Sequence, residues 1–283
     1  MAKAFRHVIV PAMSTDHLTS DRPVQPSRHG QHTGRVRHAA SKVPEVTVYF
    51  WIIKVLTTGM GETASDWLAH VLGPIPAVGV GGVAFVAALA VQFAVRRYVA
   101  WIYWTAIVVV SVFGTMAADV LHVGLGVPYL ISTPFFMVAL AAVFVLWYRS
   151  EGTLSIHSIH TRRREAFYWA AVLATFALGT AAGDLTATIG LGYLGSAVVY
   201  AAAIAVPAVA HRWSGLNAVA AFWSAYVITR PLGASVADWM ALPHRRGGLD
   251  LGLGPVTLSW TVAILGFVGY LAVSRTDVGE ATV

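Results

Sequence analysis

Four aspartates at matching positions are the residues of this sequence whose type and spacing suit a chemical task. Each lies 15 residues after a tryptophan, in the pairs Trp51 and Asp66, Trp104 and Asp119, Trp169 and Asp184, and Trp223 and Asp238. The windows between them are mostly apolar, which is typical of helices in a membrane. A carboxylate is costly inside such a helix. Four carboxylates in register therefore predict one shared site.

A small-residue motif leads to each aspartate. A glycine lies five residues before it, at Gly61, Gly114, Gly179 and Gly233, and the residues between are mostly small. Small residues allow helices to pack closely in a membrane. Packing therefore explains the glycines and the alanines that follow them, but it does not explain the aspartates.

Polar residues recur one and two helical turns before the aspartates, on the same face of each helix. This polar stripe consists of Glu62, Thr115 and Thr180 at one turn, and of Thr58 and Ser111 at two turns. Two basic residues lie on the same face, Lys54 three turns before Asp66 and Arg230 two turns before Asp238. Because lipid satisfies none of these groups, we expect the stripe to face the interior of a helical bundle or a water-filled path.

Acidic groups outnumber basic groups on this face. The four aspartates and Glu62 supply up to five negative charges, against two positive charges from Lys54 and Arg230. The surplus predicts a bound cation or exchangeable protons. The sequence has no cysteine and the four windows have no histidine, so the donors are oxygen atoms, which suit hard divalent ions. We expect such an ion as the substrate, Mn²⁺ ahead of Mg²⁺ or Ca²⁺, and no organic cofactor.

The leading hypothesis is a proton-coupled transporter of a divalent cation, in which protons replace the ion on the same carboxylates. The first alternative is a cation channel with an acidic ring. Glu62 and Lys54 occur in the first window only and Arg230 in the fourth only, which breaks the symmetry of a ring and favours a carrier. The second alternative is a structural or sensory protein. There Arg230 would neutralise Asp238 and one neighbour, and Lys54 would pair with Glu62. The remaining aspartates would be protonated and hydrogen-bonded to Thr115 and Thr180.

No catalytic motif is evident in the sequence. It lacks a Ser/His/Asp arrangement, an HExxH helix and a Gly-rich phosphate loop. Intramembrane aspartyl proteases carry a Gly-Asp motif, which Gly183 and Asp184 match, but the Tyr-Asp partner motif is missing and four copies is the wrong number. We therefore expect that the protein is not an enzyme.

Composition places the chain among membrane proteins. Of its 283 residues 57% are hydrophobic and 11% are charged, whereas soluble domains carry about 25% charged residues. The formal net charge is +6. The basic residues lie at the ends of apolar segments, so the positive-inside rule explains them better than a nucleic-acid partner does. We expect the lipid bilayer, a metal ion and protons as partners.

The hydropathy pattern predicts an all-α polytopic protein with eight transmembrane helices. The apolar segments lie near 46–70, 76–96, 99–122, 128–148, 166–188, 191–210, 216–240 and 256–273. They pair into hairpin repeats over 46–96, 99–148, 166–210 and 216–273, within a transmembrane domain at 45–275. Residues 1–44 are polar and basic, which predicts a disordered cytoplasmic tail. A short C-terminal tail follows at 276–283.

Charge asymmetry predicts the orientation. Arginines follow the second, fourth and sixth segments, and Gly-rich turns follow the odd-numbered ones. Three of these four turns carry no lysine or arginine, and Arg245 and Arg246 in the fourth are the exception. Both termini are therefore expected in the cytoplasm, in a bacterial inner membrane. Two-helix repeats all insert the same way up, so they are parallel repeats around an axis along the membrane normal. The four tryptophans at the starts of the windows are expected to be interface anchors.

Several motifs resemble a bacterial family of uncharacterised, multi-pass membrane-anchored proteins. They are Lys42 to Thr47, the loop Ser155 to Ile159, Arg163 to Trp169, Gly179 to Asp184 and Thr229 to Ala234. The likeness covers roughly residues 42–275, and the N-terminal tail departs from it. The resemblance implies a bacterial protein with repeated Gly-Thr-x-x-x-Asp helices. It carries no established activity, so the function depends on the residues.

Overall fold

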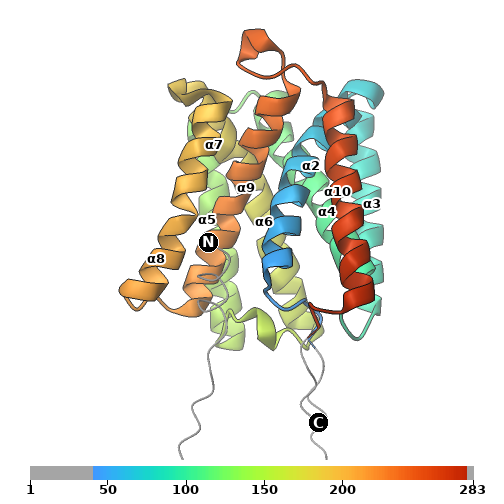
Figure 1. The fold of residues 1–283 in the computed structure, drawn as a ribbon, viewed down its shortest axis with the longest axis vertical. Coiled ribbons are helices and arrows are strands. Elements are labelled where there is room, and N and C mark those ends of the chain that lie inside the picture. Colours follow the sequence, from blue (N-terminus) through green and yellow to red (C-terminus); the bar gives the residue numbers. More distant parts are fainter. Residues whose placement is uncertain (1–40, 279–283) are drawn as a thin grey trace, which may run out of the picture.

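The fold is known from a computed structural model, which describes residues 41–278. All regular structure in this range is helical (Figure 1). The α-helices are α2 (Val48–Leu72), α3 (Pro74–Ala94), α4 (Ala100–Asp119), α5 (Tyr129–Glu151), α6 (Arg162–Thr186), α7 (Gly192–Ala203), α8 (Ala205–Trp213), α9 (Ala218–Ala241) and α10 (Leu253–Ser274). Short helical turns lie at η1 (Val120–Gly124), η2 (Ile156–Ser158), η3 (Ala187–Leu191) and η4 (His244–Arg246). The expectation of an all-α protein is thus confirmed for the described residues.

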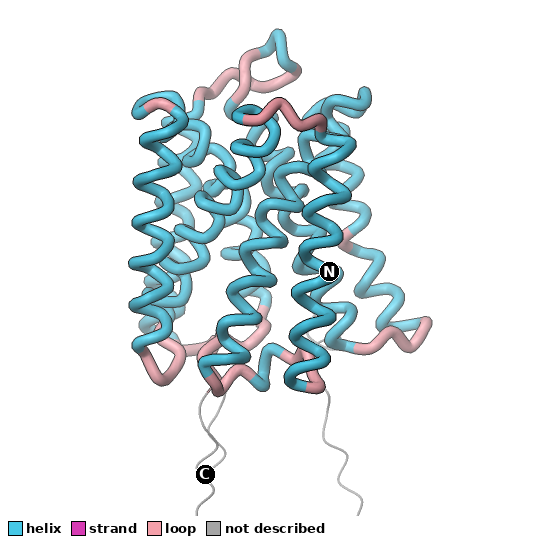
Figure 2. The backbone as a smooth tube through the Cα atoms, turned by 180° about the vertical axis from the view of Figure 1, so that it is seen from behind, coloured by secondary structure: helices cyan, strands magenta, loops and turns pink. Residues whose placement is uncertain are grey.

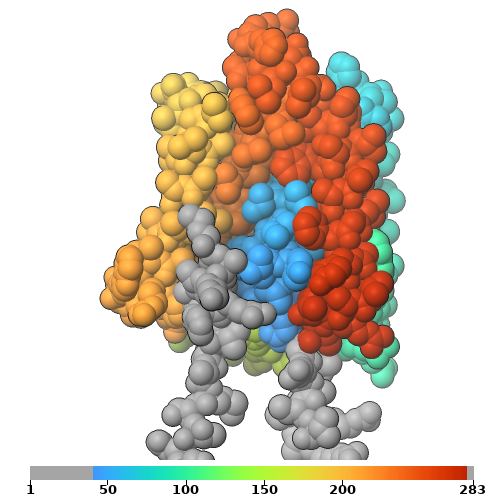
Figure 3. All heavy atoms as spheres, viewed as in Figure 1, coloured from blue at the N-terminus to red at the C-terminus, as the bar shows by residue number. Residues whose placement is uncertain are grey.

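The helices run between two ends of one bundle. The described chain begins and finishes at the same end, which we call the terminal end, as the tube view shows (Figure 2). The opposite end, which we call the turn end, holds the connections after α2, α4, α6 and α9. The last of these, the orange loop at the top of the space-filling view, rises above the rest of the turn end (Figure 3).

The four aspartate-bearing helices form an inner ring. Helix α2 contacts α4, α4 contacts α6, α6 contacts α9, and α9 contacts α2, which closes the ring. Helices α3, α5, α7 and α10 pack against the outside of these four. Their outward side chains are apolar and exposed, for example Val83, Val138 and Val273. Such a surface is compatible with a lipid bilayer.

Five helical stretches among the described residues are long and apolar enough to cross a membrane. They are Pro74–Ala94, Ala100–Gly124, Tyr129–Glu151, Arg162–Trp213 and Leu253–Ser274. Helices α2 and α9 are not among them, and these two carry the charged residues of the polar stripe, including Glu62 and Arg230. The stretches identify a membrane protein by length and composition.

Side-chain caps begin three of the four inner helices. Thr47 accepts a hydrogen bond from the Phe50 backbone N–H (3.3 Å) at the start of α2. Thr161 caps α6 through Arg164 N–H (3.2 Å), and Asn217 caps α9 through Val219 N–H (2.8 Å). Each cap satisfies a backbone donor that has no partner inside the helix. The sequence thus sets the starting positions of these helices.

The apolar segment expected at 191–210 is divided in two. Helix α7 ends at Ala203 and α8 begins at Ala205, with Ile204 between them. Pro207 explains the break, because it has no N–H to donate to the Ala203 carbonyl and its ring crowds that turn. Helix α8 leans outward from the bundle (Figure 1).

The tryptophans that were expected at the membrane interface are mostly buried, so that prediction was wrong. Trp104, Trp169 and Trp223 are 1%, 3% and 4% exposed. Each is preceded by another aromatic residue, and the ring centroids of Tyr103 and Trp169 lie 5.8 Å apart, those of Tyr168 and Trp223 6.1 Å apart. Because the ring of inner helices encloses these positions, the side chains pack together as an aromatic layer near the terminal end. We define this layer by the residue pairs Phe50 and Trp51, Tyr103 and Trp104, Tyr168 and Trp169, and Phe222 and Trp223.

The tail predicted at 1–44 lies mainly outside the described residues, but its last four residues belong to the folded part. The Lys42 ammonium pairs with Glu165 at 2.5 Å, and Gln92 donates to the same carboxylate at 3.1 Å. The Tyr98 backbone N–H donates to the Ser41 carbonyl (3.2 Å). These contacts secure the start of the chain across the terminal end.

The start of the predicted C-terminal tail is also folded. The Glu45 backbone N–H donates to the Asp277 carbonyl (2.9 Å), and the Tyr98 hydroxyl donates to the Asp277 carboxylate. Asp277 is 2% exposed. The expected boundary at residue 276 is therefore too early, because buried polar contacts extend the fold at least to Asp277. Residues 279–283 lie outside the described residues.

Replacing two of the motif glycines by alanine is expected to destabilise the inner ring. A Cβ atom at Gly114 would meet the Phe176 side chain, and one at Gly233 would meet the Thr58 side chain. Overpacking of this kind costs about 1–3 kcal/mol. Thermal unfolding of the purified protein in detergent measures the effect. Gly79→Ala is the matched control, since nothing lies within 4 Å of its added Cβ. Equal unfolding temperatures for all three variants would contradict close glycine packing.

Asp277→Asn is expected to stabilise the protein increasingly as the pH rises. Burial raises the pKa of the Asp277 carboxyl above its ordinary value of 3.8, and the Tyr98 hydroxyl offsets part of this. The folded state therefore holds the proton more tightly than the unfolded state, so wild-type stability falls as the pH rises through the raised pKa. Unfolding temperatures between pH about 4 and about 8 should diverge in favour of the variant. Parallel curves would show that the carboxyl is not destabilised by burial.

Candidate functional site

The five acidic residues singled out in the sequence line one cavity at the turn end. The cavity has a volume of about 890 Å³, and its lining includes Glu62, Asp66, Asp119, Asp184 and Asp238. The four aspartates come together because they occupy equivalent turns of α2, α4, α6 and α9, which form a closed ring. Glu62 lies one turn before Asp66 on α2. Asp238 is the most enclosed of the four aspartates, at 5% exposed.

The rest of the cavity wall is a mixture of apolar and polar groups. Its apolar part includes Ile75, Val78, Met116, Val120 and Leu253. The polar part adds five side chains that sequence reasoning missed, namely His70, His122, Tyr129, Tyr193 and Arg246.

The two histidines had a sequence signal. His70 lies four residues after Asp66, and His122 lies three residues after Asp119, so each shares a helical face with an aspartate. The His122 Nδ1 atom lies 2.7 Å from the Val127 carbonyl oxygen, so Nδ1–H is the donor in this contact. The tyrosines carried no comparable signal, because they follow turns of irregular length.

The aspartates are not neutralised by basic residues. Among residues 41–278, none of the four lies within ion-pair distance of a lysine, arginine or histidine. The same part of the chain contains no group of three His, Asp or Glu side chains arranged to hold a metal ion. The carboxylates therefore share a cavity without forming a closed chelating site.

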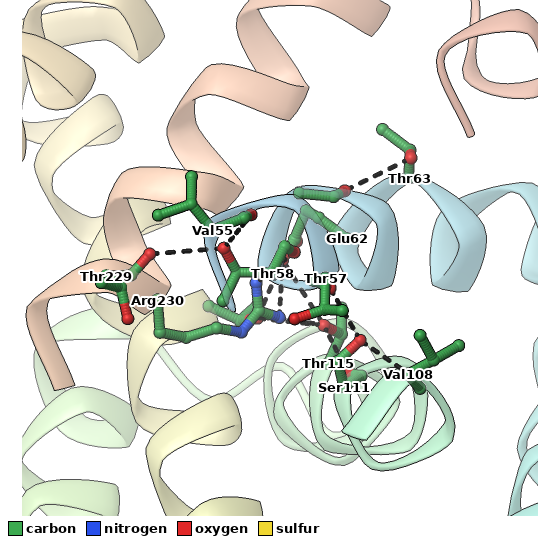
Figure 4. A network of polar contacts seen from close by, with 12 residues as sticks. Val55, Thr57, Thr58, Glu62, Thr63, Val108, Ser111, Thr115, Thr229 and Arg230 are labelled. Atoms are coloured by element: carbon green, nitrogen blue, oxygen red, sulfur yellow. Dashed lines mark hydrogen bonds and ion pairs between the residues drawn. The ribbon is translucent and has the colours of Figure 1, made fainter. Parts of the chain in front are cut away.

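Glu62 connects the cavity to a buried polar network. Its carboxylate accepts a hydrogen bond from Arg230 Nη2 at 3.0 Å and from the Thr180 hydroxyl at 3.0 Å. Arg230 Nη2 also donates to the hydroxyls of Thr115 and Thr180 (2.8 Å for Thr180), and Nη1 donates to the Thr58 carbonyl at 2.9 Å. The close-up shows Arg230 extending from α9 toward Glu62 and Thr115 (Figure 4). Residues from all four inner helices thus meet at a single guanidinium group, which is fully buried.

The basic residues do not have the partners considered from the sequence. Arg230 pairs with Glu62 instead of Asp238, and Lys54 pairs with no acid in the described structure. The reason is helix geometry: each expected pair lay eight residues apart on one helix, which is about 12 Å. The Lys54 ammonium lies over the rings of Phe176 (4.4 Å) and Tyr226 (4.2 Å) instead.

The polar stripe divides into two parts. Thr115 and Thr180 belong to the Arg230 network, as described above. The Thr58 hydroxyl donates to its own helix at the Val55 carbonyl (2.6 Å), and the Ser111 hydroxyl donates to the Thr57 carbonyl of α2 (2.9 Å). Neither of these lines the cavity, so Thr58 and Ser111 contribute to helix packing.

Bulky groups close the space between this network and the terminal end. From the Arg230 network toward the terminal end, the Lys54 side chain comes first inside the ring of inner helices. The aromatic layer lies beyond Lys54. The hydroxyls of Tyr103 and Tyr168 meet at 2.5 Å, and both side chains are at most 1% exposed. The side chains of Arg230 and Lys54 and the aromatic layer therefore separate the acidic cavity from the terminal end.

Comparison with known families matches the internal repeats. A family model described as a Repeat of Unknown Function (DUF347) matches residues 49–98, 102–153, 167–216 and 221–277. Each match contains one aspartate-bearing helix and the segment that follows it, which confirms the expectation of an uncharacterised family with internal repeats. No curated protein and no solved structure matches the chain.

A double-mutant cycle at Arg230 and Glu62 is expected to show strong coupling. Arg230→Met leaves a buried carboxylate unpaired, and Glu62→Gln leaves a buried guanidinium unpaired, each at a cost of about 3–5 kcal/mol. The double variant should lose clearly less stability than the sum of the single variants. Denaturant unfolding in detergent measures all three, with Arg245→Met at an exposed position as control. Additive losses would show that the ion pair does not organise the network.

Proposed function

This chain belongs to the Repeat of Unknown Function (DUF347) family, and we propose that it is a membrane carrier for a hard divalent cation, exchanged against protons. One observation carries the proposal. Five carboxylates from four helices line one cavity, and no basic residue of the described chain pairs with the four aspartates. A surplus of negative charge in a partly enclosed space attracts cations or protons.

The donor groups support a partly hydrated ion as cargo. Since no three ligating side chains are grouped in the described structure, one or two carboxylates would hold the ion while waters complete its shell. Imidazole suits transition-metal ions better than Mg²⁺ or Ca²⁺. The positions of His70 and His122 on the cavity wall therefore favour Mn²⁺ as the first ion to test.

The closed terminal end of the bundle is more consistent with a carrier than with a channel. A cation leaving the cavity along the axis would meet Arg230 and Lys54, both fully buried, and then the aromatic layer. An open pore needs a continuous path, whereas a carrier needs one closed side at a time. A purely structural role is disfavoured, because it needs protonated aspartates bonded to Thr115 and Thr180, whereas the hydroxyls of these threonines bond to Arg230 and Glu62.

The proposed topology is eight transmembrane helices in four tandem parallel hairpins, with α7 and α8 together making the sixth span. The four family matches support this arrangement, since each covers one hairpin. Basic residues at the terminal end, such as Arg96, Arg162 and Arg212, support a cytoplasmic location for both termini. In a bacterial inner membrane the acidic cavity would then open to the outside.

Transport assays with purified protein in liposomes test the proposal. Wild-type protein should carry Mn²⁺ when a pH gradient is applied, and Asp119→Asn and Asp184→Asn should each lower the rate at least about tenfold, because each removes a charge from the cavity. Asp250→Asn is the control, since Asp250 is exposed in the loop before α10. Rates in the two cavity variants equal to wild type would contradict a role for the aspartates in transport.

A further inference from the structure

The acidic cavity is much larger than a single metal ion requires. Its volume of about 890 Å³ falls within the range of about 300–1,000 Å³ that is typical of pockets for organic ligands. Apolar side chains such as Ile75, Val78 and Leu253 form part of its wall beside the carboxylates. A metal ion makes no use of apolar walls, whereas methylene groups of an organic cation would pack against them.

The carboxylates share this cavity, but they are not grouped as a metal chelate. They extend from four different helices of the inner ring. A metal ion contacts its oxygen ligands at about 2.0–2.6 Å. The described residues hold no triplet of His, Asp or Glu around one point. Several separated positive charges would match such a distribution better than one compact charge.

Asp238 points independently to a ligand. Its side chain is 5% exposed, lines the cavity, and has no hydrogen-bond or ion-pair partner among the described residues. A buried polar group without a partner is costly. An ammonium group carries three N–H donors and a positive charge, so it would satisfy this carboxylate directly.

We propose that the acidic cavity takes a linear organic cation with two or three ammonium groups separated by methylene chains. This inference rests on the carrier role of the proposed function and assigns it an organic cation in place of the metal ion. One ammonium group binds Asp238, and a second binds a carboxylate of another inner helix, such as Asp119. The methylene chain between them lies against the apolar wall.

Binding measurements on the full-length protein in a neutral detergent test this inference. Spermidine is the triamine probe, and n-butylamine is the matched single-charge probe. We expect spermidine to bind at least about tenfold more tightly than n-butylamine in titration calorimetry. Asp238→Asn and Asp119→Asn should each weaken spermidine binding at least about tenfold, and Asp250→Asn should leave it unchanged. Unfolding temperatures of all variants verify that they are folded.

Mn²⁺ in the same assay separates this inference from the proposed function. Spermidine binding that is no tighter than n-butylamine binding, or that is unaffected by Asp119→Asn, overturns the inference. If Mn²⁺ still binds in that case, the proposed cation carrier stands with a metal cargo. If neither spermidine nor Mn²⁺ binds, both proposals are overturned. Asp119→Asn and the comparison of the two amines test the inference even if Asp238→Asn does not fold.

Discussion

The buried ion pair between Arg230 and Glu62 is the interaction on which the rest of the structure depends. Charges removed from both water and lipid need a partner and further hydrogen bonds. Here Thr115, Thr180 and the Thr58 carbonyl supply those bonds, so all four inner helices contribute to a single group. The pair fixes how the helices meet along the axis. It also leaves the aspartates, one turn closer to the turn end, without basic partners.

This separation of charge gives the bundle two different halves. Negative groups line the cavity at the turn end, and Arg230 and Lys54 lie beneath them in the middle of the bundle. The aromatic layer then fills the space up to the terminal end, where contacts of Lys42 and Asp277 hold both ends of the described chain. Glu62 belongs to both halves, because it lines the cavity and binds Arg230. A cation bound in the cavity beside Glu62 therefore also affects the ion pair with Arg230 that joins the inner helices.

Periodicity in the sequence was enough to predict the helices and the convergence of the acidic residues on one face, because both follow from local spacing. The partners of Arg230 and Lys54 were not predictable, since they depend on contacts between helices that are far apart in sequence. The burial of Trp104, Trp169 and Trp223 was missed for a related reason. Indole side chains are suited both to a membrane interface and to a protein core, and here the closed ring of inner helices places them in the core. His70 could have been found by extending each window one further turn.

The most direct test of an acidic, cation-accessible cavity is the reactivity of a single cysteine placed in its wall, which is feasible because the sequence has no cysteine. Ala69→Cys lies on the wall beside Asp66, and Thr57→Cys, at a fully buried position between helices, is the control. A positively charged thiol reagent should react with the cysteine at 69 at least about tenfold faster than a negatively charged one of the same size, because the carboxylates concentrate cations there. Equal rates for the two reagents, or no reaction with either, would contradict such a cavity.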